Sequence, residues 1–168
     1  MSNQTSPLEL SHFPVMLNEV LKIFTPLSDE KKFIDCTFGA GGYSKEILKL
    51  SKTYVQAIDR DKKAFSLANE LEKKFPERFK FFQLKFSRLD SISGDNVDAV
   101  IFDLGLSSIQ LDDLDRGFSF KSNKKLNMTM GLNSFSALEA INNLGESDLK
   151  SVIKILGDEK EASKIAKN

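Results

Sequence analysis

The chain has 168 residues, which fits one compact domain, and its 24 basic and 24 acidic side chains cancel to a formal net charge of zero. This balance is unlike the excess of a strongly basic nucleic-acid-binding protein, so any RNA contact must come from a local patch. A single cysteine, Cys36, excludes an internal disulfide, and no apolar run approaches the roughly 18 residues of a membrane span, so we expect a cytoplasmic protein without a membrane segment.

The N-terminal residues 1–11 are polar and are expected to form a flexible tail. A helix is predicted after this tail, because apolar residues recur at the spacing of one helical face, at Leu17, Val20, Leu21 and Phe24. Pro14 is expected to open this helix and Pro26 to end it.

Strands and helices then alternate. Strands are predicted at 32–37, 54–58, 79–84 and 97–102, and helices are predicted between them at about 44–50 and 64–71. This alternation indicates βαβ units and a parallel sheet, so the predicted fold class is α/β and Rossmann-like.

The character of the chain changes after this sheet. Residues 107–133 are polar and loop-like, and the chain is helical from Ser134 onward, with an amphipathic face that Gly157 breaks. A sheet of only four strands would leave the fourth strand as an edge. We therefore interpret the chain as the N-terminal part of a longer protein, and a small complete domain is the alternative.

A glycine-rich turn, residues 38–44 with the sequence FGAGGYS, joins the first predicted strand to the next helix. Such a junction directs backbone N–H groups and the positive end of a helix at one point. Asp59 ends the second strand and lies 18 residues after Gly41. In Rossmann-like folds this spacing places a carboxylate over the hydroxyls of a ribose.

The identity of the expected ligand follows from what the turn lacks. Ser44 stands where a dinucleotide fingerprint has its third glycine, and no Gly-Lys-Ser/Thr follows as in a P-loop. A nucleoside cofactor without a pyrophosphate, such as S-adenosylmethionine, is therefore favoured over NAD. The alternative is a turn that only lets a strand meet a helix.

Other polar residues have simpler interpretations. Asp103 ends the fourth strand, where ligands bind to such sheets, and Asp61 is expected to cap the next helix. His12 is the only histidine, which leaves little for a histidine base, and Cys36 is expected to be a buried thiol. No Cys/His cluster indicates a metal site.

Several sequence blocks resemble the ribosomal RNA small-subunit methyltransferase H family. They are His12 with residues 15–19, then 34–44, 57–61, 86–87, 103–112, 116–120 and 126–130, in order along nearly the whole chain. The block 103–120 is the most specific, because a generic Rossmann protein has no reason to repeat it. The resemblance implies S-adenosylmethionine-dependent methylation of the N4 atom of a cytidine in 16S rRNA, within the small ribosomal subunit.

The resemblance also implies roles for individual residues. The cofactor contacts that it implies are Gly41, Gly42 and Tyr43 at the turn, Asp59 at the ribose, Phe86 beside the adenine, and Asp103 and Gln110 near the methionine end. From the chemistry of the reaction, Asp103 is in addition the candidate catalytic residue, as an acceptor for the N4–H group, and the nearby loop carbonyls of residues 104–108 are the alternative. The implied domains are a Rossmann-like cofactor domain at 12–106 and, at 107–168, a substrate-recognition loop with the start of an inserted helical domain.

The chain departs from the family at four points. The family usually has His where this chain has Tyr43, and Asp where it has Asn127 and Gly131, and its members are roughly twice as long. Three alternatives therefore remain open: a methyltransferase acting on another substrate, a truncated cofactor-binding fragment without activity, and, more distantly, a nicotinamide dehydrogenase. The sequence indicates no oligomeric state.

Overall fold

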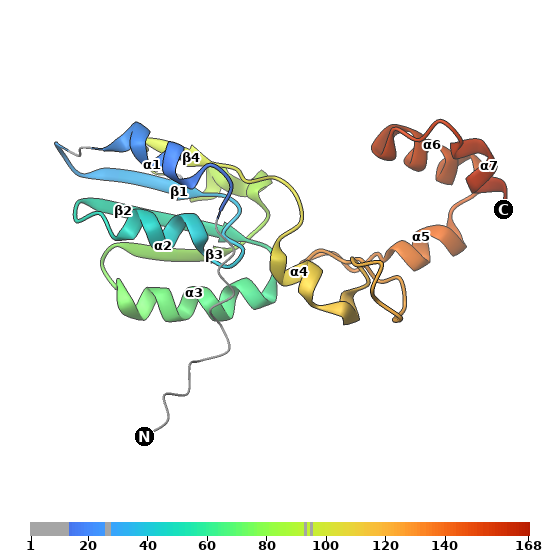
Figure 1. Cartoon of the computed structure of the whole chain (residues 1–168), viewed down its shortest axis with the longest axis horizontal. Coiled ribbons are helices and arrows are strands. Elements are labelled where there is room, and N and C mark those ends of the chain that lie inside the picture. The colour runs from blue at the N-terminus through green and yellow to red at the C-terminus, as the bar shows by residue number, and fades with distance from the viewer. Residues whose placement is uncertain (1–13, 26–27, 93, 95) are drawn as a thin grey trace, which may run out of the picture. The chain divides into compact units, whose positions relative to one another are not determined.

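The computed structural model describes residues 14–25, 28–92, 94 and 96–168 (Figure 1). The expected tail at 1–11, His12 and Pro26 lie outside the described residues. The chain forms two compact units, Met1–Ile109 and Gln110–Asn168. The domain boundary predicted after residue 106 stays a prediction.

The first unit is built on a parallel sheet. Its strands are β1 (Lys31–Asp35), β2 (Thr53–Asp59), β3 (Phe79–Gln83) and β4 (Ala99–Ile101). They lie in the order β3-β2-β1-β4, and each neighbouring pair is parallel. This is the strand order of the first half of a Rossmann fold, so the predicted α/β class is confirmed.

Strand β4 is shorter than the predicted strand at 97–102, and Asp98 explains where it begins. The Asp98 carboxylate accepts a hydrogen bond from the Lys32 backbone N–H at 2.9 Å and another from Lys31 Nζ at 2.9 Å. A side chain thus takes a donor that a strand partner would otherwise take, and the ladder with β1 starts at Ala99.

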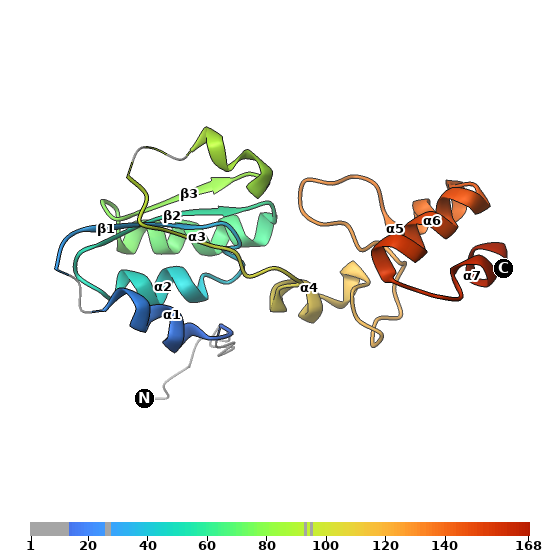
Figure 2. The ribbon, with the colours of Figure 1, turned by 90° about the horizontal axis from the view of Figure 1, so that it is seen from above.

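Three helices pack on one face of the sheet (Figure 2). They are α1 (Leu17–Phe24), α2 (Gly42–Leu48) and α3 (Lys62–Lys74). Successive side chains of a strand point to opposite faces. Phe33, Val55 and Phe79 therefore face the helices, in one buried cluster with residues such as Ile47 and Ala68. Asp61 caps α3 by accepting from the Lys63 N–H at 2.9 Å, as predicted.

The opposite face of the sheet is covered only in part. The short 3-10 helix η1 (Phe86–Ser91) contributes to a small cluster around Ile34, Cys36 and Ile58. Near the beginnings of the strands, a cavity of about 810 Å³ is lined by residues that include Lys32, Tyr54 and Lys80 of the sheet and Glu72 of α3. This cavity shares no residue with the glycine-rich turn, at the other end of β1.

The second unit consists of short helices and loops. Its elements are α4 (Ser108–Asp112, which begins just before the unit boundary), η2 (Leu114–Arg116), α5 (Ala137–Asn143), α6 (Glu146–Gly157) and α7 (Ala162–Lys167). Helix α5 begins with a capping box between Ser136 and Glu139. Helix α6 ends at Gly157, as predicted, and Asp158 follows in the left-handed conformation. None of the described helices in either unit is long and apolar enough to cross a membrane.

Candidate functional site

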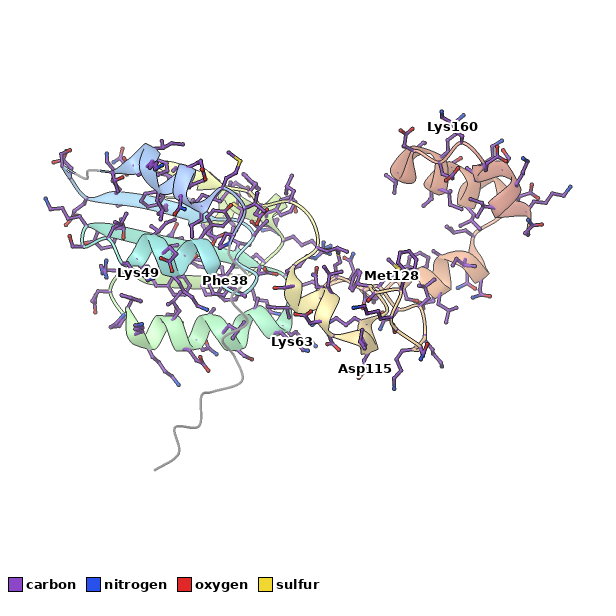
Figure 3. All side chains as sticks on the ribbon, viewed as in Figure 1. Phe38, Lys49, Lys63, Asp115, Met128 and Lys160 are labelled. Atoms are coloured by element: carbon purple, nitrogen blue, oxygen red, sulfur yellow. The ribbon has the colours of Figure 1, made fainter. Side chains whose placement is uncertain are left out.

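The glycine-rich turn leaves β1 at Asp35 and enters α2 at Gly42. Gly39 and Gly41 have φ angles of +53° and +79°, a region that side-chain-bearing residues rarely adopt. A Cβ on Gly41 would lie 2.7 Å from the Phe38 ring (Phe38 is labelled in Figure 3), whereas one on Gly39 would meet nothing nearer than 3.6 Å. Gly41 thus has no room for a side chain within the turn, whereas a Cβ on Gly39 would make ordinary van der Waals contact with Ser107 Cβ at 3.6 Å.

Asp59 is joined to this turn by hydrogen bonds. Its Oδ2 accepts from the Gly39 N–H at 2.7 Å, and its Oδ1 accepts from the Asp61 N–H at 2.8 Å. Burial raises the pKa of Asp59, while these backbone donors act in the opposite direction. The Arg60 backbone N–H is a further donor that lowers the Asp59 pKa. The structure therefore brings together the two features that the sequence paired by spacing.

Ser44, which replaces the third dinucleotide glycine, has a structural partner. Its hydroxyl donates to Asp35 Oδ2 at 2.7 Å, and the Thr37 N–H donates to Asp35 Oδ1 at 3.2 Å. Asp35 is fully buried, and burial raises its pKa to about 6 despite these two donors. Asp35 is consequently a buried group that supports the turn and not a surface for a ligand.

Asp103 lies beside the turn because the end of β4 is joined to the end of β1. The Cys36 N–H donates to the Ile101 carbonyl at 2.9 Å, and the Asp103 N–H donates to Thr37 Oγ1 at 2.8 Å. The Asp103 side chain is exposed. Burial raises the pKa of the Tyr43 hydroxyl, and the negative charge of Asp103 is the next largest cause. Asp103 and Tyr43 therefore interact electrostatically and lie in one electrostatic neighbourhood.

Phe86 is an exposed ring next to this neighbourhood. It begins η1, is 45% exposed, and meets Phe102 edge-to-face with a centroid distance of 5.7 Å. Phe102 directly precedes Asp103 in the chain. An aromatic face is thus available on the Asp103 side of the first unit, although no periodicity in the sequence could have distinguished it from a core phenylalanine.

The remaining predicted residues have different outcomes. Cys36 is 2% exposed and burial raises the pKa of its thiol to about 11, which confirms a buried thiol. Gln110 is buried in α4, at the beginning of the second unit, and its contact with a cofactor stays a prediction. Over the described ranges, no three His, Cys, Asp or Glu side chains form a group that could hold a metal ion.

Sequence reasoning missed the contacts of the segment before α1. The Tyr43 hydroxyl donates to the Val15 carbonyl, and the Pro14 ring lies against Gly42. It also missed Thr37, whose hydroxyl fixes the Asp103 backbone. These contacts join residues far apart in the chain, so no local pattern announces them.

The second unit carries a cluster of basic residues, Arg116, Lys121, Lys124 and Lys125, and acidic residues of the same loop neutralise part of it. Arg116 Nε lies 3.1 Å from Asp113, and Lys124 Nζ lies 3.4 Å from Asp115, which Figure 3 labels. Lys121 and Lys125 are exposed, and so is the Phe120 ring. The cationic character of this segment therefore depends chiefly on the two lysines.

Comparison with known proteins gives a consistent result. Residues 9–168 match the model of the MraW methylase family. Two curated relatives named ribosomal RNA small subunit methyltransferase H are each 44% identical: one from Rickettsia massiliae over 158 residues, covering 94% of this chain and 51% of the relative, and one from Ehrlichia canis over 161 residues, covering 93% and 54%. The chain thus spans about half the length of the curated relatives it matches.

Among solved structures, one described as a putative rRNA methylase from Clostridium thermocellum aligns with a TM-score of 0.47 and 20% identity. The alignment covers 54% of this chain and 52% of that one. A likeness of this size carries no argument, so the fold class rests on the strand order itself.

Proposed function

The chain belongs to the MraW methylase family, and on that premise we propose that its first unit holds the cofactor of an S-adenosylmethionine-dependent methyltransferase. The observation that carries this proposal is the bond between Asp59 and the Gly39 N–H at 2.7 Å. It fixes a carboxylate against the backbone of the glycine-rich turn, at the carboxyl ends of two parallel strands, where ligands of such sheets bind.

The residues present suit a nucleoside that bears a charged amino acid. The Asp59 carboxylate keeps acceptor capacity beyond its backbone donors and can accept a hydrogen bond from the ribose hydroxyls. The exposed Phe86 ring offers a face for a flat base, and the exposed Asp103 carboxylate offers a partner for an ammonium group. We assign these three residues to the ribose, the adenine and the methionine end. Gly41, Gly42, Tyr43 and Gln110 remain proposed cofactor-site residues.

For the reaction, we propose the N4 atom of a cytidine in 16S rRNA as the methyl acceptor. S-adenosylmethionine supplies an activated methyl group on a sulfonium. The N4 lone pair is delocalised into the cytosine ring, and a carboxylate that accepts the N4–H would localise it. We assign this role to Asp103, and the assignment is supported by the Thr37 hydroxyl, which holds the Asp103 backbone at the turn. Its task is alignment as much as proton acceptance, since in-line transfer depends on orientation.

The proposed partner is the small ribosomal subunit, in the cytoplasm. The names of the relatives support this substrate. A base must leave its helix to reach a cofactor at the edge of the sheet. The exposed Lys121 and Lys125 are proposed phosphate contacts, which makes the association salt-dependent.

Two alternatives keep specific support. Because the chain spans about half of its relatives, a cofactor-binding chain that transfers no methyl group is the first. A methyltransferase acting on another substrate is the second, since Asn127 and Gly131 replace the acidic residues usual in the family.

The test uses the full chain in two steps. Isothermal titration with S-adenosylmethionine measures binding, and transfer of a labelled methyl group to small ribosomal subunits lacking this methylation measures activity. The proposal predicts both. Binding without transfer supports the cofactor-binding alternative, transfer to another acceptor supports the second, and no binding contradicts the proposed function.

Asp103→Ala tests the assigned catalytic residue. We expect its cofactor affinity to fall by about tenfold or more, because hydrogen bonds to charged groups contribute about 1.5–3 kcal/mol. Methyl transfer should fall further. Asp29→Ala is the matched control, an exposed aspartate just before β1 at the opposite end of that strand. Unchanged binding and transfer in Asp103→Ala would remove this residue from the site.

A further inference from the structure

The segment Pro14–Val15–Met16, here named the strap, lies on the first turn of α2. A Cβ on Gly42 would come within 2.4 Å of Pro14 Cγ, so the proline ring occupies the space that a side chain there would need. The Tyr43 hydroxyl donates a hydrogen bond to the Val15 carbonyl. Two consecutive residues at the start of α2 therefore hold two consecutive residues of the strap.

The strap is also held at its far end. Leu17, the first residue of α1, is 2% exposed and belongs to the same buried cluster as Tyr43. Between these anchors Met16 has a φ angle of +55°, although it is not a glycine. A non-glycine residue keeps this conformation only where its surroundings determine it, and such residues cluster at functional sites.

The strap leaves its own apolar side chains uncovered. Val15 is 65% exposed and Met16 is 64% exposed, whereas Leu17, next in the chain, is buried. The Tyr43 anchor lies in the electrostatic neighbourhood of Asp103 and Asp35. Val15 and Met16 are thus exposed apolar side chains that are held beside the start of α2.

We propose that Tyr43 is a positioning residue, which pins the strap at the start of α2 so that the strap forms one wall of the cofactor site. This inference rests on the proposed function. The Tyr43 hydroxyl is committed to the Val15 carbonyl, so Tyr43 acts on the cofactor through the strap. Val15 and Met16 then supply apolar contact at the mouth of the site.

The chain offers a matched control, because it has only two tyrosines. Tyr43→Phe removes the hydroxyl that holds the strap and keeps the buried ring. Tyr54→Phe removes a hydroxyl that contacts Glu30 at 3.3 Å, in a residue lining the cavity near the beginnings of the strands. Tyr43→His keeps a ring with a polar donor. Gly42→Ala is an independent second variant, since its Cβ must displace Pro14.

Two measurements are made on each full-length variant. A spin label on Val15→Cys reports the mobility of the strap, and Cys36 does not compete for the label because it is 2% exposed. Titration of the unlabelled variants with S-adenosylmethionine reports affinity. Circular dichroism confirms that each variant folds.

We expect Tyr43→Phe and Gly42→Ala to mobilise the label and to weaken binding about five- to tenfold, the effect of losing one well-placed hydrogen bond. Tyr43→His should restore most of the affinity, and Tyr54→Phe should change it by no more than about twofold. A rigid label in Tyr43→Phe, or a mobile label with unchanged affinity, overturns the inference. A wild-type chain that binds no S-adenosylmethionine overturns the proposed function and the strap's binding role with it, while the label still decides whether Tyr43 holds the strap.

Discussion

The two units differ in how far they bury their apolar side chains. In the first, strands and helices share a buried cluster that includes Phe33, Ile47 and Val55. In the second, Ala162 is the only buried hydrophobic residue among those described, whereas Ile155 and Leu156 on α6 are 76% and 81% exposed. The same chain therefore contains a unit with a core of its own and a unit whose helices leave their apolar faces uncovered.

This difference separates what holds the cofactor site from what would hold a substrate. The hydrogen bonds at the proposed cofactor site, between Asp59 and Gly39 and between Ser44 and Asp35, lie within the unit that has a core. The residues proposed for RNA contact lie on loops of the other unit. Segments with few buried apolar contacts open most easily. We therefore expect the proposed cofactor site to be rigid and the proposed substrate segment to be more mobile.

The largest expected effect comes from a substitution in the core of the first unit. Ile47→Ala should lower the free energy of unfolding by about 2–5 kcal/mol, because it leaves a cavity at a residue that is 0% exposed. Ile155→Ala on α6 should change it by about 0.5 kcal/mol or less. Urea unfolding followed by circular dichroism measures both. Equal losses would show that the second unit is as well packed as the first.

The next effect concerns the buried carboxyl beneath the turn. The folded-state pKa of Asp35 is raised to about 6, so its stabilising contribution is present below the unfolded-state pKa of about 4 and is lost as the pH rises through 6. Asp35→Asn should remove this dependence, which is on the order of 3 kcal/mol between pH 4 and 7. Urea unfolding across this range measures it, with Asp29→Asn as an exposed control. If the free energy of unfolding of Asp35→Asn depends on pH as that of the wild type does, the assignment of Asp35 as a buried carboxyl is contradicted.

A smaller effect is expected from Ser44→Ala. This change removes one donor to Asp35 and should cost about 1–3 kcal/mol of stability near pH 7, where Asp35 is charged. The loss should shrink at pH 4, because the protonated Asp35 carboxyl accepts the Ser44 hydroxyl more weakly than the charged carboxylate does. Chemical unfolding at the two pH values decides it, and a loss independent of pH would indicate packing alone.

The smallest effect belongs to the second unit. Lys121→Ala should weaken association with small ribosomal subunits uniformly and reduce the slope of log affinity against log salt by about 1. Lys124→Ala should do less, because Lys124 already pairs with Asp115 at 3.4 Å. Filter binding at several salt concentrations compares the two. A larger effect from Lys124 would place the RNA contact elsewhere in the loop.

The sequence predicted features that repeat locally or that spacing determines. The alternation of strands and helices gave the parallel sheet, and the spacing of Gly41 and Asp59 predicted a junction that the structure shows. The late start of β4 was not predictable in this way, since it depends on a contact between Asp98 and Lys32, distant in the chain. The strap was not predicted for the same reason, because its contacts with Gly42 and Tyr43 join residues far apart in the chain. In the sequence, Tyr43 is one residue of a glycine-rich turn, and only the folded chain shows that its hydroxyl donates to the Val15 carbonyl.

The central claim is that Asp59, fixed on the turn, holds a ribose. Titration of the full chain with S-adenosylmethionine and with its 2′-deoxy analogue, in the wild type, Asp59→Asn and Asp61→Asn, tests it most directly. Asp61→Asn is the matched control, because asparagine caps a helix as well as aspartate does. We predict that Asp59→Asn weakens S-adenosylmethionine binding by about tenfold or more, that the wild type loses affinity for the analogue, and that Asp59→Asn no longer distinguishes the two ligands. Equal affinities of the wild type and Asp59→Asn for S-adenosylmethionine would contradict the account.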